Sequence, residues 1–429
     1  MKEIQKIQAV KTIDYEVNIP GSKSITNRVL MVSALSDGKC TLKNVLFSDD
    51  TIFMQQALRD LSFEVISSEK NSEITIQGRG TEFSNAEKPL YLGNAGTAMR
   101  FLTAMTPLGQ GEHILTGNER MHERPIKDLV DGLIPLGAGI SYLATPGFPP
   151  LKVISAGLKG GKTSMRGDVS SQFFSAIMLA ACYAKSDTEL KVIGDLVSKP
   201  YIDITLKVMA DFSVECKNLD YKRIIIPSGQ RYRHRDYTVE GDASNASYFF
   251  AAAAITGGRI RVNNIDFSTK QGDIQFVKIL ERMGCSVKSG TNYIEVQGRA
   301  TKGIDVDMRD ISDVAQTLAV VALFAEDRTV IRNVANMRVK ETDRLRALYN
   351  ELSKLGARVE EKQDGLIIEP SKTYKPAEIE TYDDHRMAMA FSLSGLKIPG
   401  VIILDPACVA KTFPTYFNLF QDMCEKSVK

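Results

Sequence analysis

Seven cationic residues of this chain stand in loops beside apolar segments, where a single charge is usually solvated. They are Lys23, Arg28, Arg124, Lys340, Arg344, Arg386 and Lys411. Clustering that many positive charges would be costly without bound anions, and one phosphate group needs fewer. The set therefore predicts a site for at least two anionic groups.

Two carboxylates lie among these cations and could transfer protons. Asp313 begins an apolar segment, and Glu341 lies between Lys340 and Arg344 in "RVKETDRL". A positioned Asp or Glu is a common general acid or base. Helix starts also favour acidic residues for structural reasons, so Glu341 alone leaves both interpretations open. Lys23 is the third catalytic candidate.

The segment "PGSKS" looks like part of a nucleotide-binding P-loop. That motif needs a glycine five residues before Gly21, where Glu16 stands. Lys23 and Ser24, with Arg28 one turn further on, instead fit an oxyanion site at a helix start. A solvated lysine is the alternative.

Two other helix starts admit both structural and functional interpretations. "GNAGTAMR" has two glycines where the backbone must approach a neighbouring group closely, either in a turn with Arg100 in an internal ion pair or around a ligand. In "DVSSQFFSA", Ser170 and Ser171 fit N-capping. A serine nucleophile would need a base and a GxSxG elbow, and neither accompanies them.

The loops that carry these residues recur along the chain. A helical stretch, a turn and a two-strand hairpin appear at 57–78, 129–157, 205–229, 276–298 and 346–370. A sixth helix, at 415–426, has no hairpin, whereas the N-terminus has strand-like segments with no helix before them. A period of about 72 residues indicates one repeated supersecondary unit. The N-terminal strands should therefore supply what the C-terminus lacks.

Each repeat is predicted to contain two different helices. The first is apolar nearly all round, as expected of a buried helix, and the second has apolar residues at helical spacing. The N-termini of the buried helices should collect at one end, where free N–H groups and the helix dipole favour anions. The loops that open the second helices contain Lys or Arg in five of six repeats, "FSDD" being the exception.

A chain of 429 residues is too long for one core. Two long strand-like connections, near residues 19–21 and 237–239, divide the repeats three and three. We therefore predict one domain at 21–238 and a second made of 1–20 and 239–429. The chain crosses twice between them, which makes a hinge, and we expect the active site in the interdomain cleft.

The composition narrows the class of protein. Hydrophobic residues are 43% and charged residues 25% of the chain, and 54 Lys and Arg against 52 Asp and Glu give a net charge of +2. This balance argues against nucleic-acid binding by bulk charge. No apolar run approaches the roughly 20 residues that span a bilayer, and the N-terminus lacks a signal-peptide core, so we expect a cytoplasmic protein. Six cysteines without a CxxC pair, and four histidines, predict reduced thiols and no metal site.

Seven segments together resemble the 5-enolpyruvylshikimate-3-phosphate synthase family. They are "PGSKSITNR", "GNAGTAMR", "ERPI", "GDVSSQF", "VEGDASNASYF", "RVKETDRL" and "DDHRMAM", and the match runs from Pro20 to about Pro414. The resemblance implies an α/β protein, a two-domain inside-out α/β barrel of six βαβαββ repeats, three per domain. It also implies transfer of the enolpyruvyl group of phosphoenolpyruvate to shikimate 3-phosphate, on the route to chorismate and the aromatic amino acids. We expect a monomer with these two small-molecule partners and no cofactor.

The resemblance also implies which residues bind each substrate. Shikimate 3-phosphate is held by Lys23, Ser24, Arg28, Ser170, Ser171, Gln172, Ser198, Tyr201, Asp313, Asn336 and Lys340. Phosphoenolpyruvate is held by Lys23, Gly96, Arg124, Gln172, Arg344, His385, Arg386 and Lys411. Asp313 takes the proton of the 5-hydroxyl and Glu341 protonates the methylene carbon. Phe101 departs from the proline common in the family, which bears on inhibitor fit.

Two alternatives remain open, a related enzyme and a module of another class that is non-catalytic or binds nucleic acid. A related carboxyvinyl transferase that acts on UDP-N-acetylglucosamine usually has a catalytic cysteine in the loop corresponding to 110–124, and this chain has no cysteine between Cys40 and Cys182. A module built on similar repeats, like the RNA phosphate cyclase relatives, would not need Asp313 and Glu341.

We expect the two domains to close on shikimate 3-phosphate, because anion-binding residues on both sides repel one another while the cleft is empty. Small-angle scattering should give a smaller radius of gyration with the ligand than without it. Calorimetry would establish binding independently. An unchanged radius in the bound protein would contradict the hinge.

Overall fold

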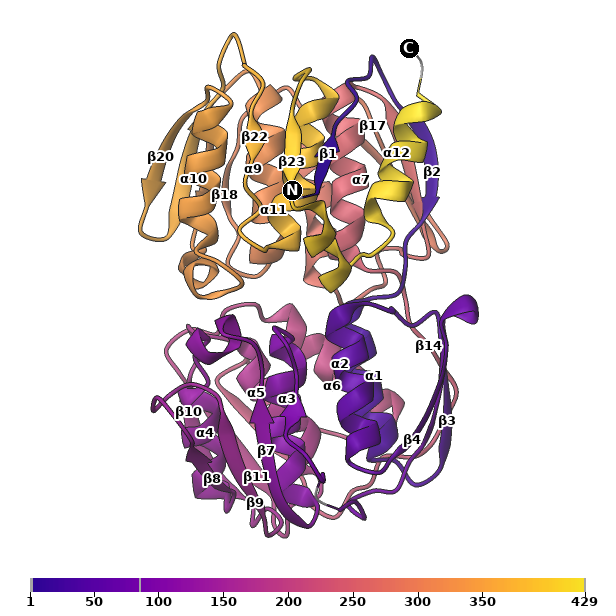
Figure 1. Ribbon diagram of the computed structural model, residues 1–429, viewed down its shortest axis with the longest axis vertical. Coiled ribbons are helices and arrows are strands. Elements are labelled where there is room, and N and C mark those ends of the chain that lie inside the picture. The colour runs from indigo at the N-terminus through magenta and orange to yellow at the C-terminus, as the bar shows by residue number, and fades with distance from the viewer. Residues whose placement is uncertain (1–2, 85, 428–429) are drawn as a thin grey trace. The chain divides into compact units, whose positions relative to one another are not determined.

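The computed structural model describes residues 3–84 and 86–427. The chain divides into two compact units, Gly21–Glu240 and Met1–Pro20 with Gly241–Lys429. Each unit has its own hydrophobic core. Figure 1 shows both, coloured along the chain. Within the described ranges, no helix combines the length and the apolar character needed to cross a bilayer.

The described part of the unit 21–240 contains three sheets with one strand order. In each, two parallel strands are followed by an antiparallel hairpin. The first sheet has β14 (Tyr237–Thr238), β3 (Lys39–Lys43), β5 (Glu73–Gln77) and β4 (Glu64–Ser68). The second has β6 (Leu90–Tyr91), β7 (Gly111–Thr116), β9 (Leu151–Ser155) and β8 (Gly139–Tyr142). The third has β10 (Gly161–Arg166), β11 (Thr188–Ile193), β13 (Arg223–Ile226) and β12 (Lys217–Leu219).

Two kinds of helix accompany these sheets. The inner helices are α1 (Lys23–Ala34), α3 (Gly96–Met105) and α5 (Ser171–Ala181), which pack against one another. The outer helices are α2 (Asp49–Asp60), α4 (Lys127–Leu133) and α6 (Pro200–Asp211). Every residue of α3 is buried, whereas α6 buries one face. The predicted contrast between buried and amphipathic helices is confirmed here.

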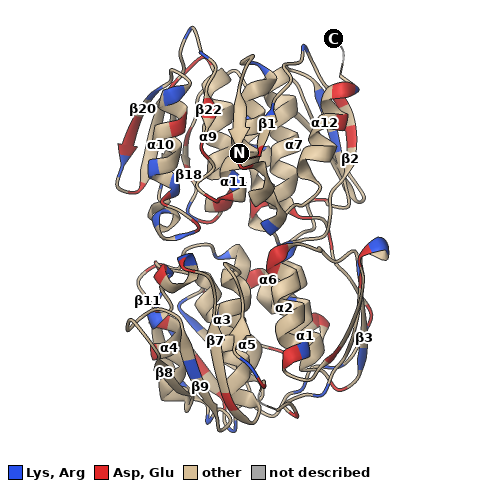
Figure 2. Ribbon diagram, viewed as in Figure 1, with Lys and Arg blue, Asp and Glu red and all other residues tan. Residues whose placement is uncertain are grey.

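The second unit repeats the same order. Its sheets are β2 (Asp14–Asn18), β15 (Arg259–Asn263), β17 (Tyr293–Gln297) and β16 (Ser286–Gly290), then β18 (Asp305–Asp307), β19 (Thr329–Arg332), β21 (Gly365–Glu369) and β20 (Arg358–Lys362), then β22 (Glu378–Ile379), β23 (Ile402–Leu404) and β1 (Ile4–Lys6). Its inner helices are α7 (Ala243–Thr256), α9 (Ala315–Val321) and α11 (His385–Ser392). Its outer helices are α8 (Phe276–Arg282), α10 (Arg344–Lys354) and α12 (Tyr416–Glu425). Helices α5, α7 and α9 carry no charged residue and are uniformly tan in Figure 2.

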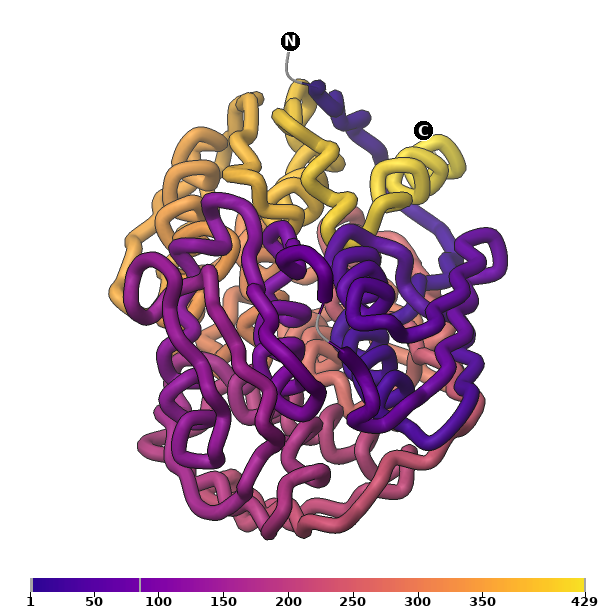
Figure 3. Tube along the Cα trace, turned by 60° about the horizontal axis from the view of Figure 1, so that its bottom comes forward, coloured from indigo at the N-terminus to yellow at the C-terminus, as the bar shows by residue number. Residues whose placement is uncertain are grey.

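The N-terminal strand completes the last sheet. β1 pairs antiparallel with β23, with Ile4 opposite Leu404 and Lys6 opposite Ile402. Figures 1 and 3 both show this indigo segment beside the yellow end of the chain. The prediction that the N-terminus supplies what the sixth repeat lacks is confirmed for β1 alone, because β2 pairs with β15 in another sheet.

The turns into α1 and α7 bring the backbone against a neighbouring loop. A Cβ atom on Gly21 would lie 1.8 Å from the carbonyl oxygen of Asn44, and one on Gly241 would lie 2.8 Å from that of Asn264. Both asparagines follow a strand and have positive φ, 52° and 66°, which Asn tolerates better than most residues. Only glycine fits this approach, which fixes where each inner helix begins.

We predict that Gly21→Ala destabilises the protein, because the new methyl group overlaps a backbone carbonyl that no rotamer change can move. The free energy of unfolding should fall by about 1–3 kcal/mol, the usual cost of overpacking. Gly139→Ala is the control, since its Cβ would lie 3.3 Å from Ile154 Cβ and 3.4 Å from the Ile154 carbonyl oxygen, much further than the 1.8 Å at Gly21. Equal denaturation midpoints for the two variants would show that the close approach is not a constraint.

Candidate active site

Asp313 is the point on which three cations of the second unit converge. It lies in the 3₁₀ turn η6 (Ser312–Val314), directly before α9. Lys340 Nζ is 2.5 Å and Arg344 Nη1 is 3.3 Å from Asp313 Oδ1. Arg386 Nη2 lies 3.2 Å from Oδ2, and its Nη1 donates to the backbone oxygen of Asp313 at 2.9 Å.

These cations decide the protonation state of Asp313. Burial would raise the pKa of its carboxyl group, but the charges of Arg386, Lys340 and Arg344 together hold that pKa well below its usual range. Asp313 is therefore an ionised, proton-accepting group at neutral pH. Burial also lowers the pKa of Lys340, which the carboxylate of Asp313 partly offsets.

Arg344 links Asp313 to two further carboxylates. The Arg344 side chain is only 1% exposed, and its Nε and Nη2 donate to the two oxygens of Asp384 at 2.7 and 3.2 Å. Nη2 also donates to Glu341 Oε2 at 2.9 Å. A bidentate guanidinium–carboxylate pair fixes orientation as well as charge. The position of Glu341 relative to Asp313 is thus set through one arginine.

Asp384 orients a second arginine of the site. Its Oδ1 accepts from the backbone N–H of Arg386 at 2.9 Å and so caps α11. The sequence shows Asp384 beside His385 and Arg386 but gives it no role, because capping and ion pairing depend on where Arg344 lies in the fold. We define Asp313, Lys340, Glu341, Arg344, Asp384 and Arg386 as the Asp313 cluster.

Three other predicted residues lie beside this cluster. Ser312 Oγ accepts from both Lys340 Nζ and Asn336 Nδ2 at 3.3 Å, so it joins two predicted ligands of one substrate. His385 is 1% exposed, with Nδ1 3.7 Å from Asp384 Oδ1. Lys411 ends the 3₁₀ helix η10 (Pro406–Lys411), which packs against α11, and it is buried.

A buried carboxyl group that sequence reasoning missed lies near Asp313. Asp273, in the 3₁₀ turn η5 (Gly272–Gln275), accepts a hydrogen bond from Ser244 Oγ in the first turn of α7. Burial, and then the negative charge of Asp313, raises the pKa of Asp273 to about 7. Neighbouring carboxyl groups with pKa values pushed apart are typical of proton-transfer sites. A loop aspartate gives no sequence signal of this kind, because burial is set by tertiary packing.

The unit 21–240 gathers its cations around the start of α3. A Cβ atom on Gly96 would lie 2.3 Å from Arg100 Nη1 and 2.6 Å from Arg124 Nη2. Arg124 Nη1 donates to the backbone and side-chain oxygens of Asn94, both at 2.9 Å. Two buried guanidinium groups therefore meet at a helix N-terminus, which itself favours anions. Arg100 was not among the predicted ligands. Its spacing of one helical turn from Gly96 in the sequence could have indicated that it lies at the same site.

Arg28 is enclosed by neutral partners. Its guanidinium donates to Thr205 Oγ1, Ser175 Oγ and the backbone oxygens of Ser24 and Tyr201, at 2.8 to 3.1 Å. Among the described residues, no carboxylate lies within 4 Å of it. Burial lowers the pKa of Arg28 to about 10, so it keeps its charge at neutral pH. A buried cation without a carboxylate favours an anion brought by a ligand.

Phe101 lies against Arg28. The Arg28 guanidinium carbon is 5.3 Å from the centre of the Phe101 ring and 5.9 Å from that of Tyr201. Such contacts stabilise a buried guanidinium by about 1–2 kcal/mol. A proline at position 101 could not make this contact, so the departure from the family pattern acts on Arg28.

The remaining predicted residues lie at the starts of α1, α5 and α6. Lys23 Nζ is 3.1 Å from Asp50 Oδ2, and both side chains are largely buried, so Lys23 is not a solvated charge. Asp50 comes from the one loop without Lys or Arg. Ser170 caps α5 by accepting from the backbone N–H of Gln172, which confirms the capping interpretation.

The inner helices also meet through polar side chains. Gln172 Nε2 donates to Thr97 Oγ1 at 3.4 Å, which joins the starts of α5 and α3. Ser171 is the first residue of α5 and is buried. Ser198 is buried and has a positive φ of 56° in the loop before α6.

The mixed α/β fold positions an ionised carboxylate, a paired glutamate and buried arginines. These features define an enzyme that acts on anionic substrates. The chain belongs to the EPSP synthase (3-phosphoshikimate 1-carboxyvinyltransferase) family, whose model matches residues 7–420. It is therefore a transferase.

Relatives in sequence and in structure agree with this. The chain is 49% identical over 419 residues to the 3-phosphoshikimate 1-carboxyvinyltransferase of Sulfurovum sp. (strain NBC37-1), covering 97% of this chain and 98% of that one. It is 50% identical over 425 residues to that of Pasteurella multocida (strain Pm70), covering 96% of each. A solved EPSP synthase from Acinetobacter baumannii superposes with a TM-score of 0.83 at 27% identity, covering 99% of this chain and 98% of that one.

The raised pKa of Asp273 predicts a pH-dependent stability. A carboxyl group whose pKa is higher in the folded state contributes stability below its unfolded value near 4, and that contribution is lost as pH rises through about 7. Asp273→Asn removes this loss of stability at high pH, because an amide side chain does not ionise. Its melting temperature relative to wild type should therefore increase by at least about 2 °C between pH 5 and pH 8.

Asp266→Asn is the matched control for this titration. Hydrogen bonds from Ser268 and Asn292 lower the pKa of Asp266, so its contribution is already complete at pH 5. The difference between Asp266→Asn and wild type should stay constant over the same range. If the melting temperatures of Asp273→Asn and wild type changed equally between pH 5 and pH 8, Asp273 would not titrate in that range.

Proposed function

We propose that this chain transfers the enolpyruvyl group of phosphoenolpyruvate to the 5-hydroxyl of shikimate 3-phosphate and releases inorganic phosphate. The observation that carries the proposal is the Asp313 cluster, in which an ionised carboxylate and Glu341 are held by the same buried arginine. One group is ready to accept a proton, and the other lies beside it to donate one.

The charges of the substrates match the two sets of cations. Each substrate carries a phosphate and a carboxylate group, so four anionic groups must be neutralised together. The unit 21–240 offers Lys23, Arg28 and Arg124, with Arg100 beside Gly96. The other unit offers Lys340, Arg344, Arg386 and Lys411.

We assign the side chains as the family resemblance implies. Shikimate 3-phosphate is bound by Ser24, Arg28, Ser170, Ser171, Gln172, Ser198, Tyr201, Asn336 and Lys340. Phosphoenolpyruvate is bound by Gly96, Arg124, Gln172, Arg344, His385, Arg386 and Lys411, and Lys23 reaches both. Because the two sets come from both units, the units must approach each other on the substrates. The proposal includes a pair of inside-out α/β barrels, each of three βαβαββ repeats, with the reaction in the cleft between them.

The proposed reaction has two stages. In the addition, Asp313 accepts the proton of the 5-hydroxyl as its oxygen attacks C2 of phosphoenolpyruvate, while Glu341 gives a proton to the methylene carbon. The product is a tetrahedral intermediate with a methyl group. In the elimination, the methyl group returns a proton to Glu341, the bond from C2 to the phosphate oxygen breaks, and the phosphate leaves with the bonding pair and takes up the proton held by Asp313.

Substrate binding itself would strengthen the base. A carboxylate with a very low pKa is a weak proton acceptor, because efficient bases have pKa values near the working pH. The substrate phosphate and carboxylate groups would neutralise part of the charge of Arg344, Arg386 and Lys340. The pKa of Asp313 would then rise toward the useful range only when both substrates are bound.

Phosphate release from phosphoenolpyruvate tests the function directly. Release should require shikimate 3-phosphate and should not occur with UDP-N-acetylglucosamine as acceptor. Release with the nucleotide sugar, or none with either acceptor in a folded protein, would overturn the proposal.

We predict that Asp313→Asn and Glu341→Gln each slow turnover by about 10²–10⁴-fold, the usual contribution of one acid or base. Both should still bind shikimate 3-phosphate. Glu341→Gln should also slow hydrogen isotope exchange at the methylene of phosphoenolpyruvate, because it removes the carbon acid. Asp305→Asn, which only loses the surface pair with Arg332, is the control. Normal exchange in Glu341→Gln would make Lys23 the next candidate.

A further inference from the structure

The segment that carries Lys340 and Glu341 has no regular structure of its own. Residues 340–343 join the 3₁₀ helix η8 (Ala335–Val339) to α10. Its backbone therefore depends on side-chain contacts for its conformation. Both ends of the segment are fixed by one residue, Arg338, which lies outside the Asp313 cluster.

Arg338 binds the far end of the segment. Its Nη1 donates to the two oxygens of Asp343 at 3.1 and 2.8 Å, so a residue that precedes the segment is joined directly to the last residue of the segment. Asp343 also accepts from the backbone N–H of Arg346 at 3.1 Å and thereby caps α10. The four residues between Arg338 and Asp343 are thus held in a closed loop at the helix start.

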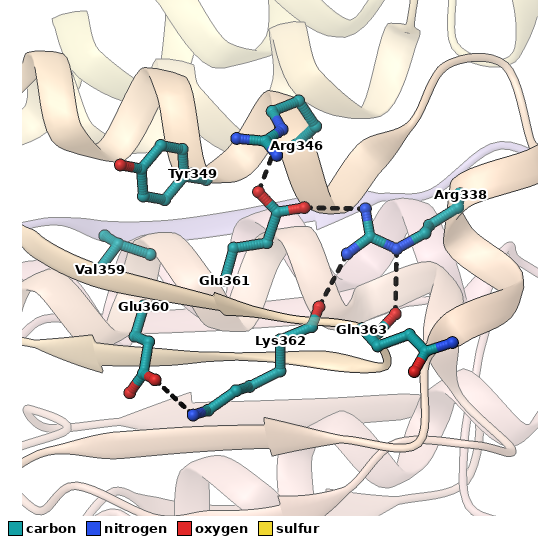
Figure 4. Close-up of a pocket in the computed structure, with 8 residues that line it drawn as sticks. All are labelled: Arg338, Arg346, Tyr349, Val359, Glu360, Glu361, Lys362 and Gln363. Carbon is teal, nitrogen blue, oxygen red and sulfur yellow. Dashed lines mark hydrogen bonds and ion pairs between the residues drawn. The ribbon is translucent and has the colours of Figure 1, made fainter.

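The same guanidinium fastens this loop to the β20–β21 hairpin. Nε donates to the backbone oxygen of Gln363 at 2.9 Å and Nη2 to that of Lys362 at 2.7 Å. Nη1 also lies 2.8 Å from Glu361 Oε1, and Arg346 Nε lies 3.1 Å from Glu361 Oε2. Figure 4 shows the guanidinium between Glu361 and the turn at Lys362 and Gln363.

We propose that Arg338 is a positioning residue that holds Lys340 and Glu341 in register with Asp313 and Arg344. This inference rests on the proposed function. Arg338 acts through the loop, because its hydrogen-bond and ion-pair partners among the described residues are Asp343, Glu361 and two hairpin carbonyls. Displacement of a reacting group by about 1 Å is enough to cost roughly 10²-fold in rate.

An arginine is needed here because of its shape. A planar guanidinium presents five N–H groups in a fixed fork, and Arg338 uses them on two carboxylates and two carbonyls. A lysine could keep the charge but could not span the same partners. Arg338→Lys should therefore be impaired, though less than Arg338→Gln.

The surroundings of Arg338 allow the variants to fold. Its side chain is 26% exposed and lines an open hollow of about 530 Å³ together with Tyr349 and Glu361. Water can enter this hollow and solvate the groups that a shorter side chain leaves behind. Arg259→Gln is the matched control, since Arg259 also bridges two carboxylates of this unit, Asp14 and Glu295, at 31% exposure.

The experiment measures turnover and the reactivity of Lys340 in the full chain. Arg338→Gln should lower kcat by about 10²-fold with a smaller change in KM, and Arg338→Lys should fall between it and wild type. Acetic anhydride should label Lys340 several-fold faster in Arg338→Gln, because the amine is held less firmly against Asp313. Arg259→Gln should match wild type in both measurements.

The positioning role also predicts non-additivity. Adding Glu341→Gln to Arg338→Gln should cost much less than Glu341→Gln costs alone, whereas a purely structural defect would give additive losses. Unchanged kcat and labelling in folded Arg338→Gln, or additive losses, would overturn the inference. If Arg338→Gln does not fold, Glu361→Gln carries the test, with the same directions expected and unchanged values overturning it. A wild-type chain without transferase activity would refute the proposed function. The labelling of Lys340 would still test whether Arg338 positions the loop.

Discussion

The ionised carboxylate of Asp313 is the constraint on which the second unit is organised. A buried carboxylate stays charged only if cations offset its loss of hydration, and these come from a loop, an outer helix and an inner helix. Asp384 then orients Arg344 and caps α11. The left-handed turn at Tyr382 and Asp383 before α11 is also held by a neighbouring helix. Buried Glu351 on α10 accepts a hydrogen bond from the Tyr382 hydroxyl at 2.7 Å.

The repeated fold explains how residues so far apart in sequence come together. Each repeat places an inner helix start and an outer helix start after parallel strands, and free N–H groups at helix starts attract anions. Gly21 and Gly241 fix the entry into α1 and α7 through close backbone contact. The inner helices α5, α7 and α9 carry no charged residue, so they pack without a charge to neutralise along their length.

The sequence predicts the elements well and the pairings poorly, for a physical reason. The period, the buried and amphipathic helices, and the addition of β1 beside β23 follow from patterns that are local or repeat regularly. The cations were recognisable because loops seldom collect so many. Their carboxylate partners Asp50, Asp384 and Asp273 were not, because an aspartate in a loop reads as solvated until the fold shows what lies opposite. Arg338 was overlooked for the same reason, as three of its four partners lie on a hairpin 23 to 25 residues further along the chain.

Two buried arginines, one in each unit, are accommodated in opposite ways, and this difference agrees with the roles proposed for them. Arg28 is surrounded by hydroxyl groups, carbonyl oxygens and aromatic rings, so it keeps an unneutralised charge for a ligand. Arg344, by contrast, is already paired with Asp313, Glu341 and Asp384. A site that only binds needs the first arrangement. A site that moves protons needs the second, because a ligand anion that competes for the same arginine changes the basicity of the carboxylates it displaces. In the proposed reaction, binding of the substrate phosphate and carboxylate groups would thereby raise the proton affinity of Asp313.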